Sequence, residues 1–392
     1  ASRATFSFAT VPLQKEIGLT PVEIGYIFSA FGWSYVAGQI PGGALLDRYG
    51  SRPIYLWSIT LWSVFTALQA FVSWISVIPV MISLFLLRLL LGASESPSFP
   101  ANARIVANWF PHSERGTASA IFNASQYFSL VAFAPLMGWL AQNYGWRSVF
   151  LWMGIIGLFG AALFWLVVDS PARHKWISRR EYDHIEKNGA LVNLDRPAAA
   201  PQTIRWSSVG QLLGNRMLLG IYLAQYCITA LTYFYATWFP IYLIKARGMS
   251  LTGAGFASAG PAIAGFVGGV LGGVLSDLLL KKGVPLSRSR KTVILLGLVI
   301  SCAILLCNYT DSQALIMLFM SIAFFGKGVA ALGWAVMSDA APREATGLSG
   351  SIFNLFGNAA GIFTPIGIGY ILASTGNNWD LALVFVFAHS II

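Results

Sequence analysis

Apolar stretches of about twenty residues follow one another along the whole chain, with short polar segments between them. A stretch of this length crosses a hydrocarbon core of about 30 Å as one helix, and about twelve of them can be placed. Because backbone polar groups must find partners inside a bilayer, the pattern predicts an all-α membrane protein. The chain starts and stops within apolar sequence, so we expect its first and last helices to be truncated.

The two halves of the chain repeat each other. Segment 18–47 aligns without gaps with segment 248–277 at an offset of 230, and GTASAIFN (116–123) matches GLSGSIFN (347–354) at an offset of 231. The long alignment keeps one aspartate pair and five glycine pairs, namely Asp47/Asp277, Gly18/Gly248, Gly25/Gly255, Gly38/Gly268, Gly42/Gly272 and Gly43/Gly273. Since small residues let membrane helices approach closely, we expect helix contacts at Gly38, Gly42, Gly43, Gly268, Gly269, Gly272 and Gly273.

A parallel repeat joined by a polar linker is typical of transporters whose halves rock about a site at the bilayer midplane. The repeat predicts twelve helices in two pseudo-symmetric six-helix halves. The longest polar stretch divides the chain into an N-terminal half at 1–169, a linker at 170–214 and a C-terminal half at 215–392.

The charges are distributed unevenly between alternate loops. The chain is 56% hydrophobic and 10% charged, with a net charge of +10. One set of loops holds most cations, namely Arg48, Arg52, Arg115, those within 173–216 and 281–291, and Arg343, whereas the opposite set holds Lys15, Arg147, Lys245 and Arg247. This bias predicts that the linker and both termini are cytoplasmic, and it accounts for the basic charge without a nucleic-acid partner.

Catalytic and metal sites are not indicated. No nucleophile, base and orienting group recur near one another, so an enzyme is disfavoured. The three cysteines, Cys227, Cys302 and Cys307, lie in apolar stretches without metal-ligand spacing, and we expect them to be structural. No cofactor and no metal are expected.

Four ionisable residues fall at membrane depth: Arg3, Arg88, Glu95 and Lys327. Such residues are costly to insert and indicate function. Arg88 and Glu95 are two helical turns apart and share one face, and the offset of 231 pairs Lys327 with Ser96. Three cations therefore converge with one carboxylate, which predicts a cavity that attracts anions. Two alternatives stay open: a structural Arg88–Glu95 pair, and a Lys327 kept neutral by its apolar surroundings.

Amides, hydroxyls and polar aromatics surround these charges at helical spacings. They are Tyr35 and Gln39, Asn123, Gln126 and Tyr127, Gln225 and Thr229, and Asn354 and Asn358. Hydrogen bonding between helices explains any single one equally well. Together, with cations in both halves, they favour a polyhydroxylated acid as the ligand.

One loop resembles a family signature. GGALLDRYGSR (42–52) is similar to the loop between the second and third helices of the major facilitator superfamily. The resemblance implies that Asp47, Arg48 and Arg52 make charge contacts that lock one conformation. The second half carries a degenerate copy, GGVLSDLLLKKG (272–283).

Within that superfamily the chain resembles the anion:cation symporters, and among them the bacterial carriers of glucarate and galactarate. The resemblance covers essentially the whole chain and includes GYIFSAFGWSYVAGQIPGG, TWFPIYLIKARGMS and FFGKGVAALGWAVMSDAAPREATGLSGSIFNLFGN. It implies that Glu95, beside Arg88, couples protons. It also implies substrate-binding roles for Arg3, Tyr35, Gln126, Gln225, Trp334 and Asn354, to which the amide pattern adds Asn123.

Lys327 has a specific expected role. Carriers of monocarboxylate hexonates tend to have a neutral residue at this position, so the resemblance implies that Lys327 holds the second carboxylate of a diacid. One departure is Ser2, where the bacterial carriers usually have an aspartate that titrates. Either this branch couples through Glu95 alone, or the aspartate has been replaced in this chain.

These inferences combine into one expectation: a monomeric, proton-coupled importer of sugar diacids in the bacterial inner membrane, working by alternating access. Its partners would be the anionic substrate, protons and the lipid bilayer. A carrier of hexonates or hexuronates is the first alternative. A sugar-acid receptor that does not transport is the second.

Overall fold

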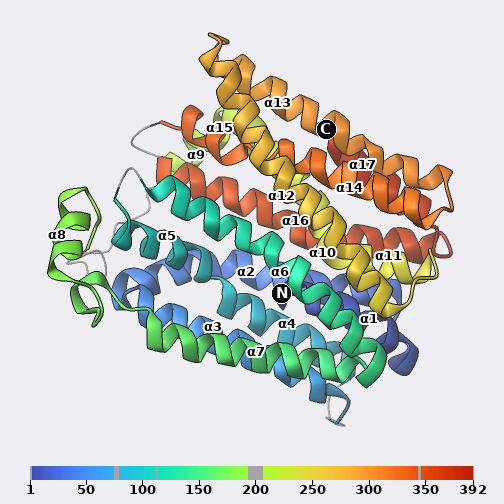
Figure 1. Ribbon diagram of the computed structural model, residues 1–392. Helices are drawn as coiled ribbons and strands as arrows, with labels where there is room; N and C mark the ends of the chain where they lie inside the picture. Colours follow the sequence, from blue (N-terminus) through green and yellow to red (C-terminus); the bar gives the residue numbers. More distant parts are fainter. Residues whose placement is uncertain (1, 75–78, 112–113, 193–205, 343–345, 392) are drawn as a thin grey trace.

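The computed structural model describes residues 2–74, 79–111, 114–192, 206–342 and 346–391, and every regular element in these ranges is a helix (Figure 1). We call residues 1–169 the N half and residues 215–392 the C half. The N half contains α1 (Ser2–Ile17), α2 (Pro21–Tyr49), α3 (Ser51–Leu68), η1 (Gln69–Trp74), α4 (Val80–Glu95), α5 (Ser98–Trp109), α6 (Arg115–Tyr144) and α7 (Trp146–Val167).

The C half has the same order of long helices. It contains α10 (Arg216–Thr237), α11 (Phe239–Lys245), α12 (Leu251–Lys281), α13 (Leu286–Ser301), η3 (Cys302–Tyr309), α14 (Gln313–Val329), α15 (Gly333–Ala340), α16 (Thr346–Ser374) and α17 (Trp379–Ile391). Three short helices lie between the halves: η2 (Pro171–Arg173), α8 (Arg179–Lys187) and α9 (Trp206–Gly214).

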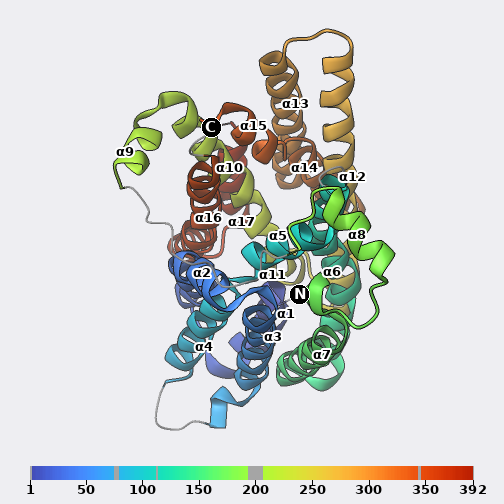
Figure 2. The ribbon, with the colours of Figure 1, turned by 90° about the vertical axis from the view of Figure 1, so that its left-hand side faces the viewer.

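Within the described ranges, eight spans are long and apolar enough to cross a membrane. Adding α1, α2, α6 and α17, which are shorter or more polar, gives twelve described spans, as predicted. The helices of each half lie side by side, with α8 at one end of the bundle (Figures 1 and 2). We call the end that carries α8 the linker end, and the opposite end the far end.

Matched residues begin the second helix of each repeat. Gly18 and Gly248 both have a positive φ, of 79° and 66°, which glycine adopts without strain. Two residues later, the hydroxyls of Thr20 and Ser250 accept a hydrogen bond from the third residue of α2 and α12, respectively. Such caps satisfy otherwise unpaired backbone donors. The repeat therefore includes the turns as well as the helices.

The halves meet in a pseudo-symmetric seam towards the far end, where α2 packs along α16 and α6 along α12. A Cβ atom on Gly25 would lie 2.7 Å from the Pro365 carbonyl oxygen, and one on Gly255 would lie 2.6 Å from that of Ala134. Both distances are shorter than a Cβ tolerates. These two matched glycines thus permit close contact between the halves. Among the glycines predicted at helix contacts, Cβ atoms on Gly38, Gly42, Gly268 and Gly272 would lie within 3.1 Å of a neighbouring span.

Hydrogen bonds between the halves also lie at the far end. Tyr26 and Tyr370 bring their hydroxyl oxygens to 3.1 Å, and the Thr252 amide donates to Gln142 Oε1 at 3.0 Å. Lys245 donates to Gln14. At the linker end, Cβ atoms on the matched Gly43 and Gly273 would meet nothing within 4 Å, so the helix contacts predicted for these two glycines are not present. The described contacts therefore close the far end.

Candidate substrate site

The corresponding membrane span of each half is broken into two helices. In the N half, α4 ends at Glu95 and α5 begins at Ser98, because Pro97 has no amide hydrogen to continue the helix. In the C half, α14 ends at Val329 and α15 begins at Gly333. Discontinuous helices of this kind form substrate and ion sites in transporters. Glu95 lies directly at the first break, and Lys327 lies two residues before the end of α14.

Both predicted charges on α4 are buried. Arg88 is 2% exposed, and its guanidinium carbon lies 5.3 Å and 5.8 Å from the ring centroids of Phe6 and Phe28, within cation–π range. Glu95 is 9% exposed, and its backbone carbonyl, freed by the break, accepts a hydrogen bond from Ser98 Oγ at 2.6 Å. The seven-residue spacing separates the two by about 10 Å of helix rise. Their coupling role stays a prediction.

Lys327 is 7% exposed, and its observed surroundings are aromatic. The Nζ atom lies 5.2 Å from the ring centroid of Phe324, on its own helix, and 5.7 Å from that of Tyr127, on α6 of the other half. Nζ also donates to Tyr127 Oη at 3.4 Å, longer than a usual hydrogen bond. No ion pair between described side chains includes Lys327. The Lys327 side chain is therefore held between aromatic rings of the two halves, and its role in substrate binding stays a prediction.

The predicted amides of the C half lie on the neighbouring helices α10 and α16. Gln225 Nε2 donates to Thr229 Oγ1 at 3.2 Å. A Cβ atom on Gly333 would lie 2.7 Å from Gln225 Oε1, and one on Gly357 would lie 3.2 Å from Nε2. These two glycines leave room for the Gln225 amide beside the break that begins α15.

A second polar group follows on α16. Asn358 Nδ2 donates to Asn354 Oδ1 at 3.1 Å, and Tyr233 donates its hydroxyl to Asn358 Oδ1 at 3.2 Å. Trp334 is half-exposed and stacks edge-to-face on Phe353, with ring centroids 4.9 Å apart. The structure therefore gathers Gln225, Trp334 and Asn354 around the second break.

The candidate substrate-binding residues of the N half differ in their burial. Tyr35 is 1% exposed and stacks on Phe31, whereas Gln126 is exposed on α6. Arg3 and Asn123 belong to helices, but their side chains lie outside the described set. Their substrate contacts stay predictions.

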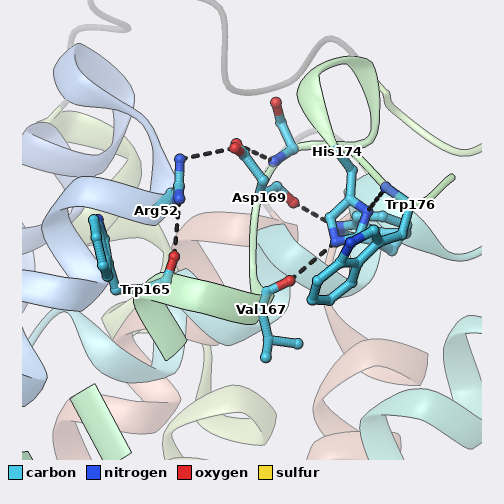
Figure 3. A network of polar contacts seen from close by, with 8 residues as sticks. Arg52, Trp165, Val167, Asp169, His174 and Trp176 are labelled. Atoms are coloured by element: carbon cyan, nitrogen blue, oxygen red, sulfur yellow. Dashed lines mark hydrogen bonds and ion pairs between the residues drawn. The ribbon is translucent and has the colours of Figure 1, made fainter. Parts of the chain in front are cut away.

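The predicted gate is partly described, and its ion pair lies within the N half (Figure 3). Arg52 bonds Asp169 Oδ2 at 2.7 Å through Nη1 and the Trp165 carbonyl at 3.0 Å through Nη2. Trp109 donates its indole hydrogen to the Asp169 carbonyl at 3.0 Å. Arg48 is exposed and lies over the Tyr49 ring, and the Asp47 side chain is outside the described set. The locking role stays a prediction.

Sequence reasoning missed an ion-pair network at the linker end of the C half. Arg290 bonds Asp339 at 3.2 Å, Ser276 at 2.9 Å and Asp277 at 3.7 Å, linking α12, α13 and α15. Asp277 was recognisable as the match of Asp47, but nothing marks Arg290 among its basic neighbours. Tyr127 was recognised only as one of several polar groups, because its contact with Lys327 joins residues 200 positions apart.

Comparisons with known proteins define the class. Residues 1–365 match the Major Facilitator Superfamily. The chain belongs to this superfamily of membrane transporters, as the signature loop predicted, and not to an enzyme family.

Curated relatives match across the whole chain. It is 51% identical over 393 residues to the "Probable galactarate/D-glucarate transporter" of Escherichia coli (strain K12), covering 100% of this chain and 87% of that protein. It is 54% identical over 392 residues to the protein of the same description from Bacillus subtilis (strain 168), covering 100% and 86%. A "D-galactonate transporter" of Escherichia coli O6:H1 is 39% identical, covering 100% and 89%.

Solved structures agree on the fold. A bacterial homologue of the lysosomal transporter Spinster, described as inward-facing and occupied, has a TM-score of 0.72 at 17% identity, covering 99% of this chain and 88% of that one. The Escherichia coli xylose transporter, described as partially occluded and inward open, has a TM-score of 0.69 at 13% identity, covering 100% and 93%. The predicted twelve-helix fold is confirmed.

Proposed function

We propose that this chain is a proton-coupled symporter that imports the sugar diacids galactarate and D-glucarate across the bacterial inner membrane by alternating access. The observation that carries the substrate assignment is the agreement between two full-length relatives, at 51% and 54% identity, that are both described as galactarate/D-glucarate transporters.

The chemistry of Lys327 supports a diacid. A buried ammonium needs an anion to compensate its lost hydration, and the described contacts of Lys327 are aromatic. A carboxylate arriving between the halves supplies that anion. With one substrate carboxylate at Arg3 in the N half, the second carboxylate reaches Lys327 in the C half. A monoacid has no group for the second position.

The distribution of ion pairs supports a cytoplasmic linker end. At the far end, Arg147 pairs with Glu16 at 2.5 Å and Arg247 with Asp311 at 2.9 Å. Although burial works against the charge of Arg247, hydrogen bonds to Tyr242 and Asp311 raise the pKa of its guanidinium. At the linker end, several exposed cations lie outside the described ion pairs, among them Lys281, Lys282, Arg288 and Lys291. Excess positive charge marks the cytoplasmic side, so closure of the far end corresponds to an inward-facing state.

Uptake into proteoliposomes tests the proposal. An imposed gradient, acidic outside, should drive accumulation of labelled galactarate, and unlabelled D-glucarate should compete far better than D-galactonate. Binding without accumulation would point instead to a receptor. Equal competition by D-galactonate would favour the monoacid carrier, the alternative that the 39% identical D-galactonate transporter supports.

A further inference from the structure

We propose that Tyr127 is a specificity-determining residue that positions the Lys327 ammonium for the second carboxylate of a diacid. The inference rests on the proposed function, because it assigns Tyr127 to the same step. It differs from the family resemblance, which assigns Tyr127 no role.

Tyr127 belongs to the other half of the molecule. It lies on α6, whereas Lys327 and Phe324 lie on α14. The Tyr127 and Phe324 rings meet edge-to-face with centroids 6.3 Å apart, and both face Nζ, at 5.7 Å and 5.2 Å. The ammonium therefore lies against two rings, one from each half.

The Tyr127 ring is held in place from several sides. It contacts Phe266 on α12, with centroids 6.2 Å apart, and a Cβ atom on Gly265 would lie 3.3 Å from its Cε1 and 2.8 Å from Phe324 Cδ1. A larger residue at 265 would push against both rings. Gly265 thus leaves the space in which they converge on Lys327.

Phe324 connects this position to the closed far end. It stacks on Tyr235 with centroids 4.0 Å apart, and Tyr235 donates its hydroxyl to the Met320 carbonyl at 2.7 Å. Phe324 and Tyr235 also line a small, mostly apolar pocket between the halves, with Phe8 and Leu130 from the N half. The lining residues of this pocket are mostly apolar and include no charged side chain.

The aromatic ring of Tyr127 contributes more to positioning the Lys327 ammonium than its hydroxyl does. A desolvated cation–π contact is a substantial attraction, whereas the 3.4 Å hydrogen bond is long and weak. The ring restricts the four rotatable bonds of the lysine before the substrate arrives, so less side-chain entropy is lost on binding. A diacid gains from this preorganisation, and a monoacid does not.

The test measures Kd for galactarate and D-galactonate with the full chain in nanodiscs. Tyr127→Met removes the ring but keeps side-chain bulk, and it should weaken galactarate binding about 3- to 30-fold while D-galactonate binding stays within about twofold. Tyr127→Phe should restore galactarate affinity. Tyr26→Met is the matched control, because Tyr26 also contacts the other half but at the far end, and it should leave the ratio of the two affinities unchanged.

A double-mutant cycle separates positioning from mere packing. If Tyr127 acts through Lys327, Tyr127→Met should add nothing to the loss caused by Lys327→Asn. Equal losses for both acids in Tyr127→Met, or a full additional loss in the double variant, would overturn the inference. Should Tyr127→Met not fold, Tyr127→Leu takes its place with the same expectations.

Failure of the role inferred for Tyr127 can be distinguished from failure of the proposed function. If Lys327→Asn selectively weakens galactarate but Tyr127→Met does not, the positioning role is wrong and the proposed function stands. If the unmodified chain binds both acids equally and Lys327→Asn changes neither, the proposed diacid function is wrong, and the role of Tyr127 falls with it.

Discussion

Both halves break the corresponding membrane span, but they carry opposite charges beside the break. In the N half the break follows Glu95, with Arg88 two turns earlier on α4. In the C half the break follows Lys327, whose described partners are the Tyr127 and Phe324 rings. The two halves thus share an architecture but carry different ionisable groups beside the break. A carboxyl beside one break can exchange a proton, whereas a cation beside the other can hold a substrate anion.

Removing the titratable group from the N-half break should have the largest effect. Glu95→Gln keeps the shape but cannot release a proton, so exchange of galactarate should persist while accumulation driven by a pH gradient is abolished. Counterflow and gradient-driven uptake in the same proteoliposomes measure the two activities. Normal accumulation in this variant would assign coupling to another group.

Disturbing the seam between the halves should come next. Gly255→Leu forces a side chain against the Ala134 carbonyl, which is backbone and cannot move cheaply. Overpacking of this kind costs about 1–3 kcal/mol, which would shift the equilibrium away from far-end closure about 5- to 150-fold. Distances between spin labels on cysteines replacing Tyr26 and Tyr370 report the shift.

The control for the seam is on the same helix. Gly273→Leu should leave the label distances unchanged, because a Cβ atom there meets nothing within 4 Å. If Gly255→Leu and Gly273→Leu change the label distances equally, the close contact at Gly255 does not control the opening of the far end.

The C-half ion-pair network should have a smaller effect, on stability. Arg290→Ala removes contacts to Asp277, Asp339 and Ser276 and should lower the free energy of unfolding by about 1 kcal/mol, since the network is partly exposed. Arg288→Ala, two residues away and outside the described ion pairs, should have no effect. Denaturant titration of both variants measures whether Arg290 contributes more to the free energy of unfolding than Arg288 does.

The smallest predicted effect concerns Ser2, where the chain departs from related carriers. In Ser2→Asp, the ionised carboxylate competes with substrate for Arg3, and protonation removes the competitor. Galactarate affinity should therefore fall about threefold as pH rises through the titration of the new acid, and proton-driven uptake should increase. An unchanged pH profile would mean that this position does not titrate in the transport cycle.

Most of the architecture could be predicted from the sequence, because hydrophobic stretches and internal repeats are visible directly along the chain. Twelve spans, the matched glycines and the buried Arg88, Glu95 and Lys327 could all be inferred without coordinates. The contact between Tyr127 and Lys327 could not, because it depends on how the two halves approach each other. Arg290 was missed for a related reason: which of several neighbouring cations meets Asp339 depends on the packing of α13 against α15.

The breaks at Glu95 and near Lys327 were also beyond sequence reasoning. Pro97 marks the first break, since proline interrupts a helix. The second, at 330–332, has no proline and lies in the sequence VAALG, which is compatible with a continuous helix. At the offset of 231, the first break at 96–97 corresponds to 327–328, three residues before the second break, so the repeat indicates only its approximate position.

Selection of a diacid by Lys327 can be measured with two ligands that differ only at one end. Galactarate and D-galactonate share their hydroxyl pattern but end in a carboxylate or a hydroxymethyl group. In Lys327→Asn, galactarate binding should weaken by about 1.5–3 kcal/mol, the value of a charge-assisted hydrogen bond, while D-galactonate binding is unchanged. Isothermal titration calorimetry of both ligands gives the answer: a loss confined to galactarate supports the account, and equal losses for both acids would contradict it.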